Sequence, residues 1–289
     1  MPSLLDMRRR IKSVKSTQQI TKAMKMVAAA KLKRAQERVV ASRPFAQKMS
    51  EVLSNLSSKI SEDFSHPLLN RRGDRNYLIV LVTADRGLCG AFNANIIRTA
   101  QSFMQENPDK SFRLIPVGRK GRDFFRRRSI PFVAEYVGLT GKGRAEHSDA
   151  VKIAQNIIKI FTEDESIDKV FLIYSEFKSV LSQRPIVEQL LPIPRSSAEE
   201  TGKPQAEYIY EQPPNEIFGK LLPMQVETQI YKALLESVAS EQGSRMTAMD
   251  SASKNAGELI DKLTLTMNRI RQATITKEII EVVSGASAL

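Results

Sequence analysis

The chain has 289 residues, of which 42% are hydrophobic and 26% are charged. This composition excludes a disordered or collagen-like protein, and the length favours at least two structural units. A single cysteine, Cys89, excludes an intramolecular disulfide and a cysteine-rich metal site. No apolar run reaches the length of about 18 residues that a membrane-spanning helix needs. We therefore expect a soluble intracellular protein without a metal or cofactor.

The net charge of +12 is concentrated at the beginning of the chain. Residues 1–60 carry 14 Lys or Arg against 3 Asp or Glu, whereas residues 61–213 and 214–289 are nearly neutral. A basic block of this kind usually meets an acidic partner, a nucleic acid or an anionic membrane surface. An organellar transit peptide would also be basic, but the helical pattern described next runs far past the usual length of one.

The first 60 residues contain no glycine, and their apolar side chains recur at helical spacing. Beyond Pro44 they alternate strictly three and four residues apart, which is the heptad seam of a helix that winds around a partner helix. Pro44 removes one backbone donor, so we expect a kink or a brief break there. The seam residues are Met7, Ile11, Val14, Ile20, Met24, Val27, Leu32, Ala35, Val39, Ala46, Met49, Leu53, Leu56 and Ile60.

In the middle of the chain, short apolar runs alternate with helical segments. This alternation predicts a mostly parallel α/β sheet. The stretch 194–216 is rich in Pro, Glu and Ser and reads as a loop. The predicted strands are 77–83, 112–117, 132–137, 169–174 and 187–191, and the predicted helices are 93–105 and 147–161.

Two pairs of glycines follow predicted strands, Gly87 with Gly90 and Gly118 with Gly121. Neither pair completes a phosphate-binding fingerprint, so we interpret both as tight turns. Cys89 is expected to be a small buried residue, because no histidine lies near it in the sequence. The three arginines at 126–128 are interpreted as a solvated turn. No group of residues in this region has the pattern of a catalytic site.

The last part of the chain predicts a second long helix. Residues 224–284 contain no proline, and the helix is expected to end near Ser284 and Gly285. Small residues at Ala248, Ala252 and Ala256 allow close approach of a second helix. Two long amphipathic helices at the two ends most simply pair as an antiparallel coiled coil. The expected domains are an N-terminal coiled-coil helix (1–65), an α/β domain (66–213) and a C-terminal coiled-coil helix (214–289).

From these features alone, two other classes remain open. A basic coiled coil beside an α/β domain is compatible with a nucleic-acid-binding protein, although the first 45 residues offer only Phe45 for base stacking. The central domain is also compatible with a small-molecule enzyme that carries helical oligomerisation arms, although neither glycine fingerprint is complete.

Five long motifs resemble the gamma subunit of F-type ATP synthase, and together they cover the chain from end to end. They are Ile20–Lys31 (ITKAMKMVAAAK), Ser42–Ala46 (SRPFA), Asp85–Asn93 (DRGLCGAFN), Ser240–Met246 (SEQGSRM) and Asn268–Ile279 (NRIRQATITKEI). The resemblance begins almost at Met1, which leaves no room for a transit peptide, and the chain lacks the inserted cysteine pair of plastid forms. The chain is therefore identified as resembling the bacterial type of this family.

The resemblance implies a noncatalytic rotor subunit in the central stalk. In this family an antiparallel coiled coil carries a Rossmann-like α/β domain, inserted between its two helices, at one side of its base. The upper part of the coiled coil lies inside a ring of three alpha and three beta subunits. The base, together with the epsilon subunit, stands on the c-ring, and proton flow turns c-ring and stalk together while ATP is made on the beta subunits. The implied location is peripheral, on the cytoplasmic side of the inner membrane, with indirect membrane contact through the c-ring. No cofactor and no nucleic acid are implied.

The resemblance also implies which residues contact the alpha/beta ring. Basic residues of the shaft face an acidic loop of the beta levers, and another group matches a contact with a second loop of the beta ring. For each cation the alternative is a solvated side chain, and for Met24 it is a seam residue. The first group is Met24, Lys25, Lys31, Lys33 and Arg245, and the second is Arg271, Gln272 and, one turn further on, Thr276.

Overall fold

The computed structural model describes residues 3–59, 66–139, 143–194 and 213–286. These residues form two compact units, one made of residues up to Ala28 together with those from Arg245 onward, and one made of Ala29–Ser244. Two long helices, α1 (Leu4–Lys59) and α5 (Pro214–Ala286), contribute to both units. The predicted loop 194–216 lies mostly outside the described residues.

Both long helices accommodate a proline in their interior. The helix α1 continues through Pro44, so the brief break expected there does not occur, and α5 continues through Pro223. The helix α5 begins at Pro214, the expected start of the C-terminal helix, because the carbonyl of Pro213 accepts hydrogen bonds from the amides of Glu216 and Ile217. The last three residues of the predicted loop 194–216 are therefore helical. A proline in the first turn costs no hydrogen bond, since that amide has no partner within the helix.

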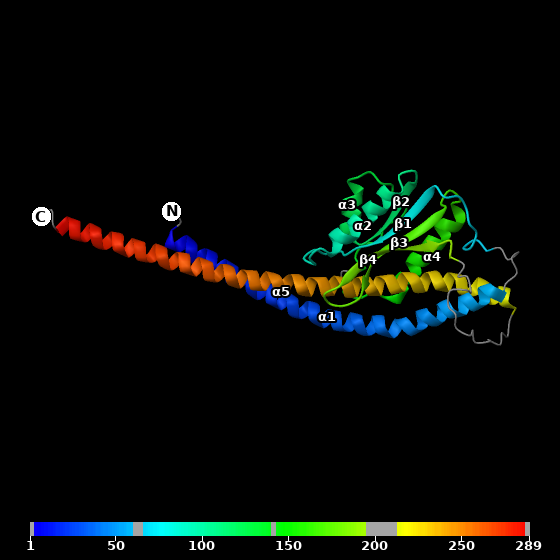
Figure 1. Ribbon diagram of the computed structural model, residues 1–289, viewed down its shortest axis with the longest axis horizontal. Coiled ribbons are helices and arrows are strands. Elements are labelled where there is room, and N and C mark those ends of the chain that lie inside the picture. Colours follow the sequence, from blue (N-terminus) through cyan, green and yellow to red (C-terminus); the bar gives the residue numbers. More distant parts are fainter. Residues whose placement is uncertain (1–2, 60–65, 140–142, 195–212, 287–289) are drawn as a thin grey trace. The chain divides into compact units, whose positions relative to one another are not determined.

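In the first unit, the segment of α1 up to Ala28 and the segment of α5 from Arg245 lie side by side (Figure 1, blue and orange). Lys25 Nζ is 2.6 Å from Asp250 Oδ1, and Gln18 Nε2 donates to the carbonyl of Ser253 over 3.3 Å. An earlier residue of α1 thus meets a later residue of α5, which confirms the predicted antiparallel pairing in this unit. A Cβ at Gly257 would lie 3.1 Å from Gln18 Nε2, so the small residue lets the helices approach closely.

The second unit contains a four-stranded sheet in the order β2-β1-β3-β4. The first three strands are parallel and β4 is antiparallel to β3, as expected for a mostly parallel sheet. The segment predicted as a strand at 132–137 forms only two isolated bridges, Leu114 with Phe132 and Val117 with Tyr136. The strands are β1 (Asn76–Val82), β2 (Ser111–Val117), β3 (Lys169–Phe177) and β4 (Gln183–Leu191).

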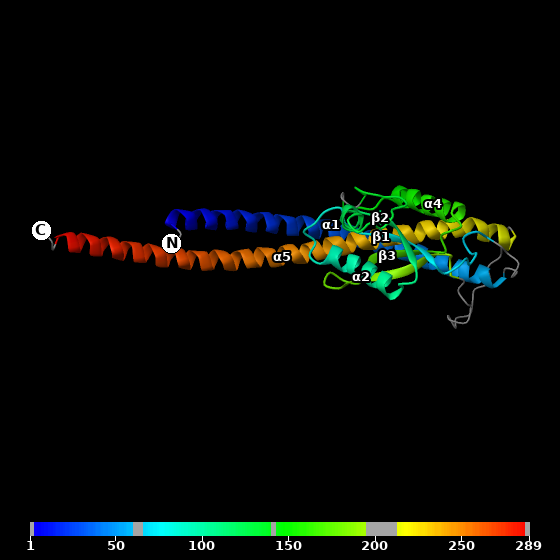
Figure 2. The same ribbon diagram turned by 90° about the horizontal axis from the view of Figure 1, so that it is seen from above.

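Helices α2 (Phe92–Glu106) and α4 (His147–Glu163) lie on opposite sides of the sheet (Figure 2). This arrangement follows from right-handed crossovers, because the chain moves in opposite directions along the sheet after β1 and after β2. A short helix, α3 (Arg119–Arg126), was not predicted. The fully buried core between the sheet and α2 includes Ile79, Leu81, Ile96, Ala100, Leu114 and Ile173.

The predicted tight turns are present at the ends of β1 and β2. Gly118 has a φ of +104°, and a Cβ at this position would collide with the backbone carbonyl of Thr83. Only glycine fits there, so β2 can pass directly into α3. Cys89 is buried, as expected, and its sulfur accepts a hydrogen bond from Asn93 Nδ2 over 3.1 Å.

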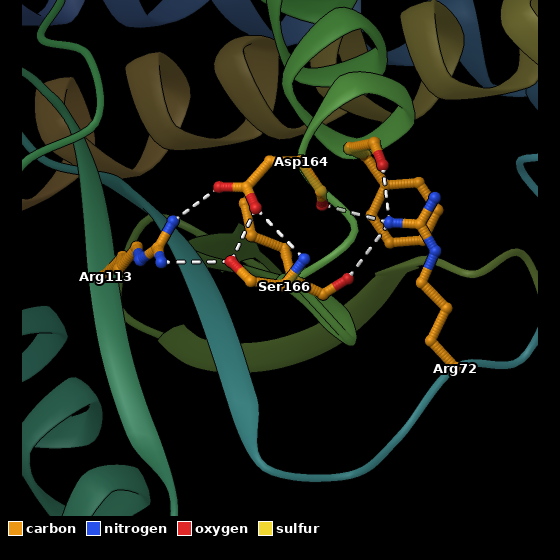
Figure 3. Close-up of polar contacts among 6 residues, drawn as sticks. Arg72, Arg113, Asp164 and Ser166 are labelled. Carbon is orange, nitrogen blue, oxygen red and sulfur yellow. Dashed lines mark hydrogen bonds and ion pairs between the residues drawn. The ribbon is translucent and has the colours of Figure 1, made fainter.

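The carboxyl end of α4 is fixed to the sheet by two arginines (Figure 3). Arg72 Nη1 donates to the carbonyls of Phe161, Asp164 and Ile167 over 2.7, 3.1 and 3.4 Å. The guanidinium also lies 4.5 Å from the centroid of the Phe161 ring. Arg113 bonds to Asp164 and to the hydroxyl of Ser166. The bond to Phe161 satisfies one carbonyl of the last turn of α4, and the other bonds hold the chain that follows the helix.

Candidate partner-contact surfaces

The eight residues predicted to contact the alpha/beta ring fall into both units. Lys31 and Lys33 belong to the second unit, and the other six belong to the first. Their contacts with other subunits remain predictions. The burial and the hydrogen bonds of each side chain nevertheless decide how far it is accessible to a partner.

Lys25 already has a carboxylate partner. Its Nζ lies 2.6 Å from Asp250 Oδ1, and the other oxygen of Asp250 is 3.3 Å from Lys254 Nζ. Hydrogen bonds from Lys25 and then Lys254 lower the pKa of the Asp250 carboxyl. Lys25 thus joins the two helices while part of its side chain stays exposed. Met24 beside it is half-buried, in agreement with its place in the seam.

Arg271, Gln272 and Thr276 are exposed on α5. The hydroxyl of Thr276 donates to the backbone carbonyl of Gln272 over 2.9 Å. This bond does not involve the Gln272 side chain, which is exposed. Arg245 is half-buried at the start of the same segment. Of the predicted polar contacts in this unit, Arg271, Gln272 and Thr276 are therefore more accessible than Lys25 and Arg245.

The carboxyl-terminal end of α5 is apolar and uncovered, a feature that the sequence analysis did not single out. Because Lys25 lies opposite Asp250, Leu4 at the start of α1 falls opposite residue 271, roughly, and α5 continues beyond it. Large apolar side chains beyond that point are 47–71% exposed: Ile275, Ile279, Ile280, Val282 and Val283. Five exposed large apolar side chains within three turns of a helix, interspersed with Lys277, Glu278 and Glu281, make this end a candidate protein interface. The exposed end of α5 could have been inferred from the sequence, because α5 is longer than α1 and the two helices pair antiparallel.

In the second unit, Lys31 lies at a cavity lined by several further cations. The cavity has a volume of about 160 Å³, and its cationic lining comes from Lys31, Arg34 and Arg38 of α1 and from Arg144. Lys33 precedes Arg34 in α1, but its side chain is exposed and does not line the cavity. The sequence analysis identified Lys31 but not its three neighbours. The spacing of three and four residues along α1 could have identified Arg34 and Arg38 from the sequence. Arg144 is distant from them in the sequence and reaches the cavity only in the folded chain.

A second cavity of about 510 Å³ contains the buried carboxylate of Glu236. Its Oε2 accepts the amide of Phe177 over 3.0 Å, and its Oε1 lies 4.0 Å from Arg43 Nη2. Burial raises the pKa of Glu236, and Glu176 adds to the rise, whereas the Phe177 amide, Lys232 and Arg43 act in the opposite direction. This carboxylate connects α5 to β3, and we assign it a structural role.

Two absences hold within the described ranges. Within them, no group of three or more His, Cys, Asp or Glu side chains is placed to hold a metal ion. No helix in the same ranges is both long and apolar enough to cross a membrane.

The chain was compared with known protein sequences. The sequence profile of a family described as ATP synthase matches residues 3–289. The chain is 51% identical to the ATP synthase gamma chain of Solibacter usitatus, covering 100% of this chain and 99% of the relative. It is 53% identical to the ATP synthase gamma chain of Desulforamulus reducens, with full coverage of both chains.

Solved structures give a consistent result for the fold. A chain from the central stalk and c-ring of the Tetrahymena thermophila mitochondrial ATP synthase matches 81% of this chain and 99% of its own length, with 30% identity and a TM-score of 0.59. A chain from the Euglena gracilis mitochondrial ATP synthase, in an assembly of OSCP, F1 and c-ring, matches 99% of this chain and 94% of its own length. That match has a TM-score of 0.69 at 19% identity and concerns the fold alone.

Proposed function

Because the chain belongs to the family of ATP synthase gamma chains, we propose that it is the central-stalk rotor that transmits torque between the c-ring and the beta subunits. In this proposal, proton flow turns the c-ring together with this chain. The asymmetric shaft then drives each beta subunit in turn through its catalytic states. The chemistry belongs to the beta subunits, and this chain is noncatalytic.

The observation that best supports this proposal is the uncovered apolar end of α5. An isolated soluble protein gains nothing from a helix end that exposes five large apolar side chains to water, because burying each one is worth about 1.5–3 kcal/mol. A collar formed by other subunits around this end would recover that free energy. An apolar collar also suits a rotating end, since apolar contacts are non-directional and do not fix one angle.

The polar contacts along the shaft fit a surface that must slide. We propose that Lys31 and Lys33 face the acidic levers of the beta subunits, together with Met24, Lys25 and Arg245. Exposed ion pairs contribute only about 0–1 kcal/mol each, so they break and form again at each step. Arg271 and Gln272, with Thr276 nearby, are proposed to meet a second loop of the beta ring.

We further propose that the epsilon subunit and the c-ring are partners of the base of this chain. Contact with the membrane is then indirect and peripheral, on the cytoplasmic side of the inner membrane. The family membership supports this location, because the matched structures include central-stalk and c-ring assemblies.

The direct test is co-expression of this chain with its cognate alpha and beta subunits, followed by purification through a tag on the beta subunit. The proposal expects one copy of this chain for every three alpha and three beta subunits. The purified complex should hydrolyse ATP, and this chain alone should not. Recovery of equal numbers of all three chains, or hydrolysis by this chain alone, would rule the proposal out.

A further inference from the structure

Apart from Lys31, which is proposed above to face the beta subunits, the residues that line the cavity between α1 and α5 in the second unit have no role in the proposed function. We propose that it is an oxyanion site that binds phosphate, either as the free ion or as the phosphate group of a nucleotide. The assignment uses the cavity and its charges, and it does not depend on the family of the chain.

The cations converge because of their spacing on one helix. Lys31, Arg34 and Arg38 lie three and four residues apart, so they share one face of α1, and Arg144 approaches from a loop. Buried Leu235 and Val238 of α5 line the same cavity. Arg34 and Arg38 remain exposed to water, so the apolar wall formed by Leu235 and Val238 reduces the screening of their charge on one side only.

The positive charge of the cavity is only partly neutralised by the protein. Arg144 Nε forms an ion pair with Glu146 Oε1 over 2.9 Å. Among the described residues, no Asp or Glu forms an ion pair with Lys31, Arg34 or Arg38. Cations held next to each other repel, and an anion between them relieves this repulsion. Arginine forks bind phosphate oxygens in pairs, which favours an oxyanion over a halide.

Two contacts hold the cations in place before any anion binds. Arg38 Nη1 donates to the carbonyl of Ala145 over 3.4 Å. The aliphatic part of Lys31 lies over Gly143, where a Cβ would be only 2.8 Å from Lys31 Cδ. Gly143 has a φ of +72°, a conformation that suits glycine. The Lys31 side chain can therefore pack on the loop because Gly143 has no side chain.

The volume of the cavity decides the size of the ligand. Pockets that enclose whole small molecules measure about 300–1,000 Å³, and this cavity is about half the lower limit. It has room for one phosphate group with a few waters. A nucleotide would place a phosphate inside and leave its base and sugar outside.

The proposal is tested by titrating the full-length chain with inorganic phosphate and measuring the heat of binding at low ionic strength. We expect saturable binding, and the variant Arg34→Gln should weaken it by roughly tenfold, as expected for the loss of a charge-assisted hydrogen bond. Lys33→Gln is the matched control, because it removes the same charge from the neighbouring residue of α1, which does not line the cavity. It should leave the affinity within about twofold, which is the scatter of surface substitutions.

Non-saturable binding, or equal loss in the two variants, would overturn the proposal and indicate diffuse attraction to a basic helix. Thermal unfolding provides a second measurement, because phosphate that binds the folded state should raise the unfolding midpoint of the native chain and not that of Arg34→Gln. Tighter binding of ADP than of phosphate in the same cavity would identify a nucleotide as the source, and equal or weaker binding would identify the free ion. These measurements use the isolated chain, so their failure leaves the proposed rotor function intact.

Discussion

The two units of this chain are stabilised in different ways. The second unit surrounds a four-stranded sheet, and the side chains of β1 are almost completely removed from water. The first unit consists of two helix segments joined by few specific contacts, such as the ion pair of Lys25 with Asp250. Its helix α5 ends in a series of exposed apolar residues. The second unit thus supplies its own core, whereas the first leaves apolar surface for other proteins to cover.

This difference separates two kinds of substitution. A change in the core of the second unit should alter the stability of the isolated chain. A change at the end of α5 should alter assembly and leave the isolated chain almost unaffected. The four predictions below test this distinction, in order of decreasing expected effect on stability.

The largest effect is expected for Leu81→Ala in β1. Leu81 is 0% exposed and belongs to the core between the sheet and α2. The substitution should lower the free energy of unfolding by about 2–5 kcal/mol, since it leaves a cavity in a packed core. Urea unfolding followed by circular dichroism measures this change. Leu181→Ala is the matched control, because Leu181 is 85% exposed and its truncation should cost less than about 0.5 kcal/mol. Equal effects would show that the sheet is not the core.

The next effect concerns the carboxyl end of α4. Arg72→Gln removes the group that bonds to three backbone carbonyls, and it should lower the free energy of unfolding by about 1–3 kcal/mol. Hydrogen exchange should show faster opening of the last turn of α4. Arg75→Gln removes an equal charge from an exposed side chain three residues away and should leave both measurements unchanged. A loss of similar size in Arg75→Gln would indicate an effect of net charge.

A smaller, pH-dependent effect is expected for Glu236→Gln. Burial raises the pKa of Glu236 in the folded state above the usual value of a glutamate. The stability associated with this carboxyl is therefore present at low pH and is lost as the pH rises through the folded pKa. The variant, which is neutral and still accepts the Phe177 amide, should be more stable than the native chain at pH 7, and the difference should shrink as the pH falls and the carboxyl becomes protonated. A difference that stays equal as the pH falls would refute the assignment.

The smallest effect on stability is expected at the end of α5. The double variant Ile279→Ser, Val282→Ser should change the unfolding of the isolated chain by less than about 0.5 kcal/mol, because both side chains are exposed. It should nevertheless reduce recovery of this chain with alpha and beta subunits after co-expression. Glu278→Gln with Glu281→Gln, on the same turns of the helix, provides a polar control that should assemble normally. Normal assembly of the serine variant would remove the evidence for an apolar collar.

Much of the fold could be predicted from the sequence because hydrophobic periodicity is a local signal. The helices α1, α2 and α4 and all four strands lie where the apolar pattern indicated them. The helix α3 was missed because Gly118 and Gly121 were interpreted as a turn, although one glycine makes the turn and the other packs inside the helix.

The candidate surfaces were less predictable, because they depend on which segments meet. The pairing of Lys25 with Asp250 joins residues far apart in the sequence, and so does the approach of Arg144 to the cations of α1. Motif similarity identified single positions but not their neighbours. Exposure of the end of α5 depends on where α1 begins, which required the register of the two helices.

The central claim is that this chain turns inside an alpha/beta ring. The most direct measurement attaches a visible probe to the α/β domain of this chain in a surface-fixed complex with its cognate alpha and beta subunits. On addition of MgATP, we expect stepwise rotation of the probe in one direction, at a rate that follows ATP hydrolysis. Sustained hydrolysis while the bound chain stays stationary would contradict it.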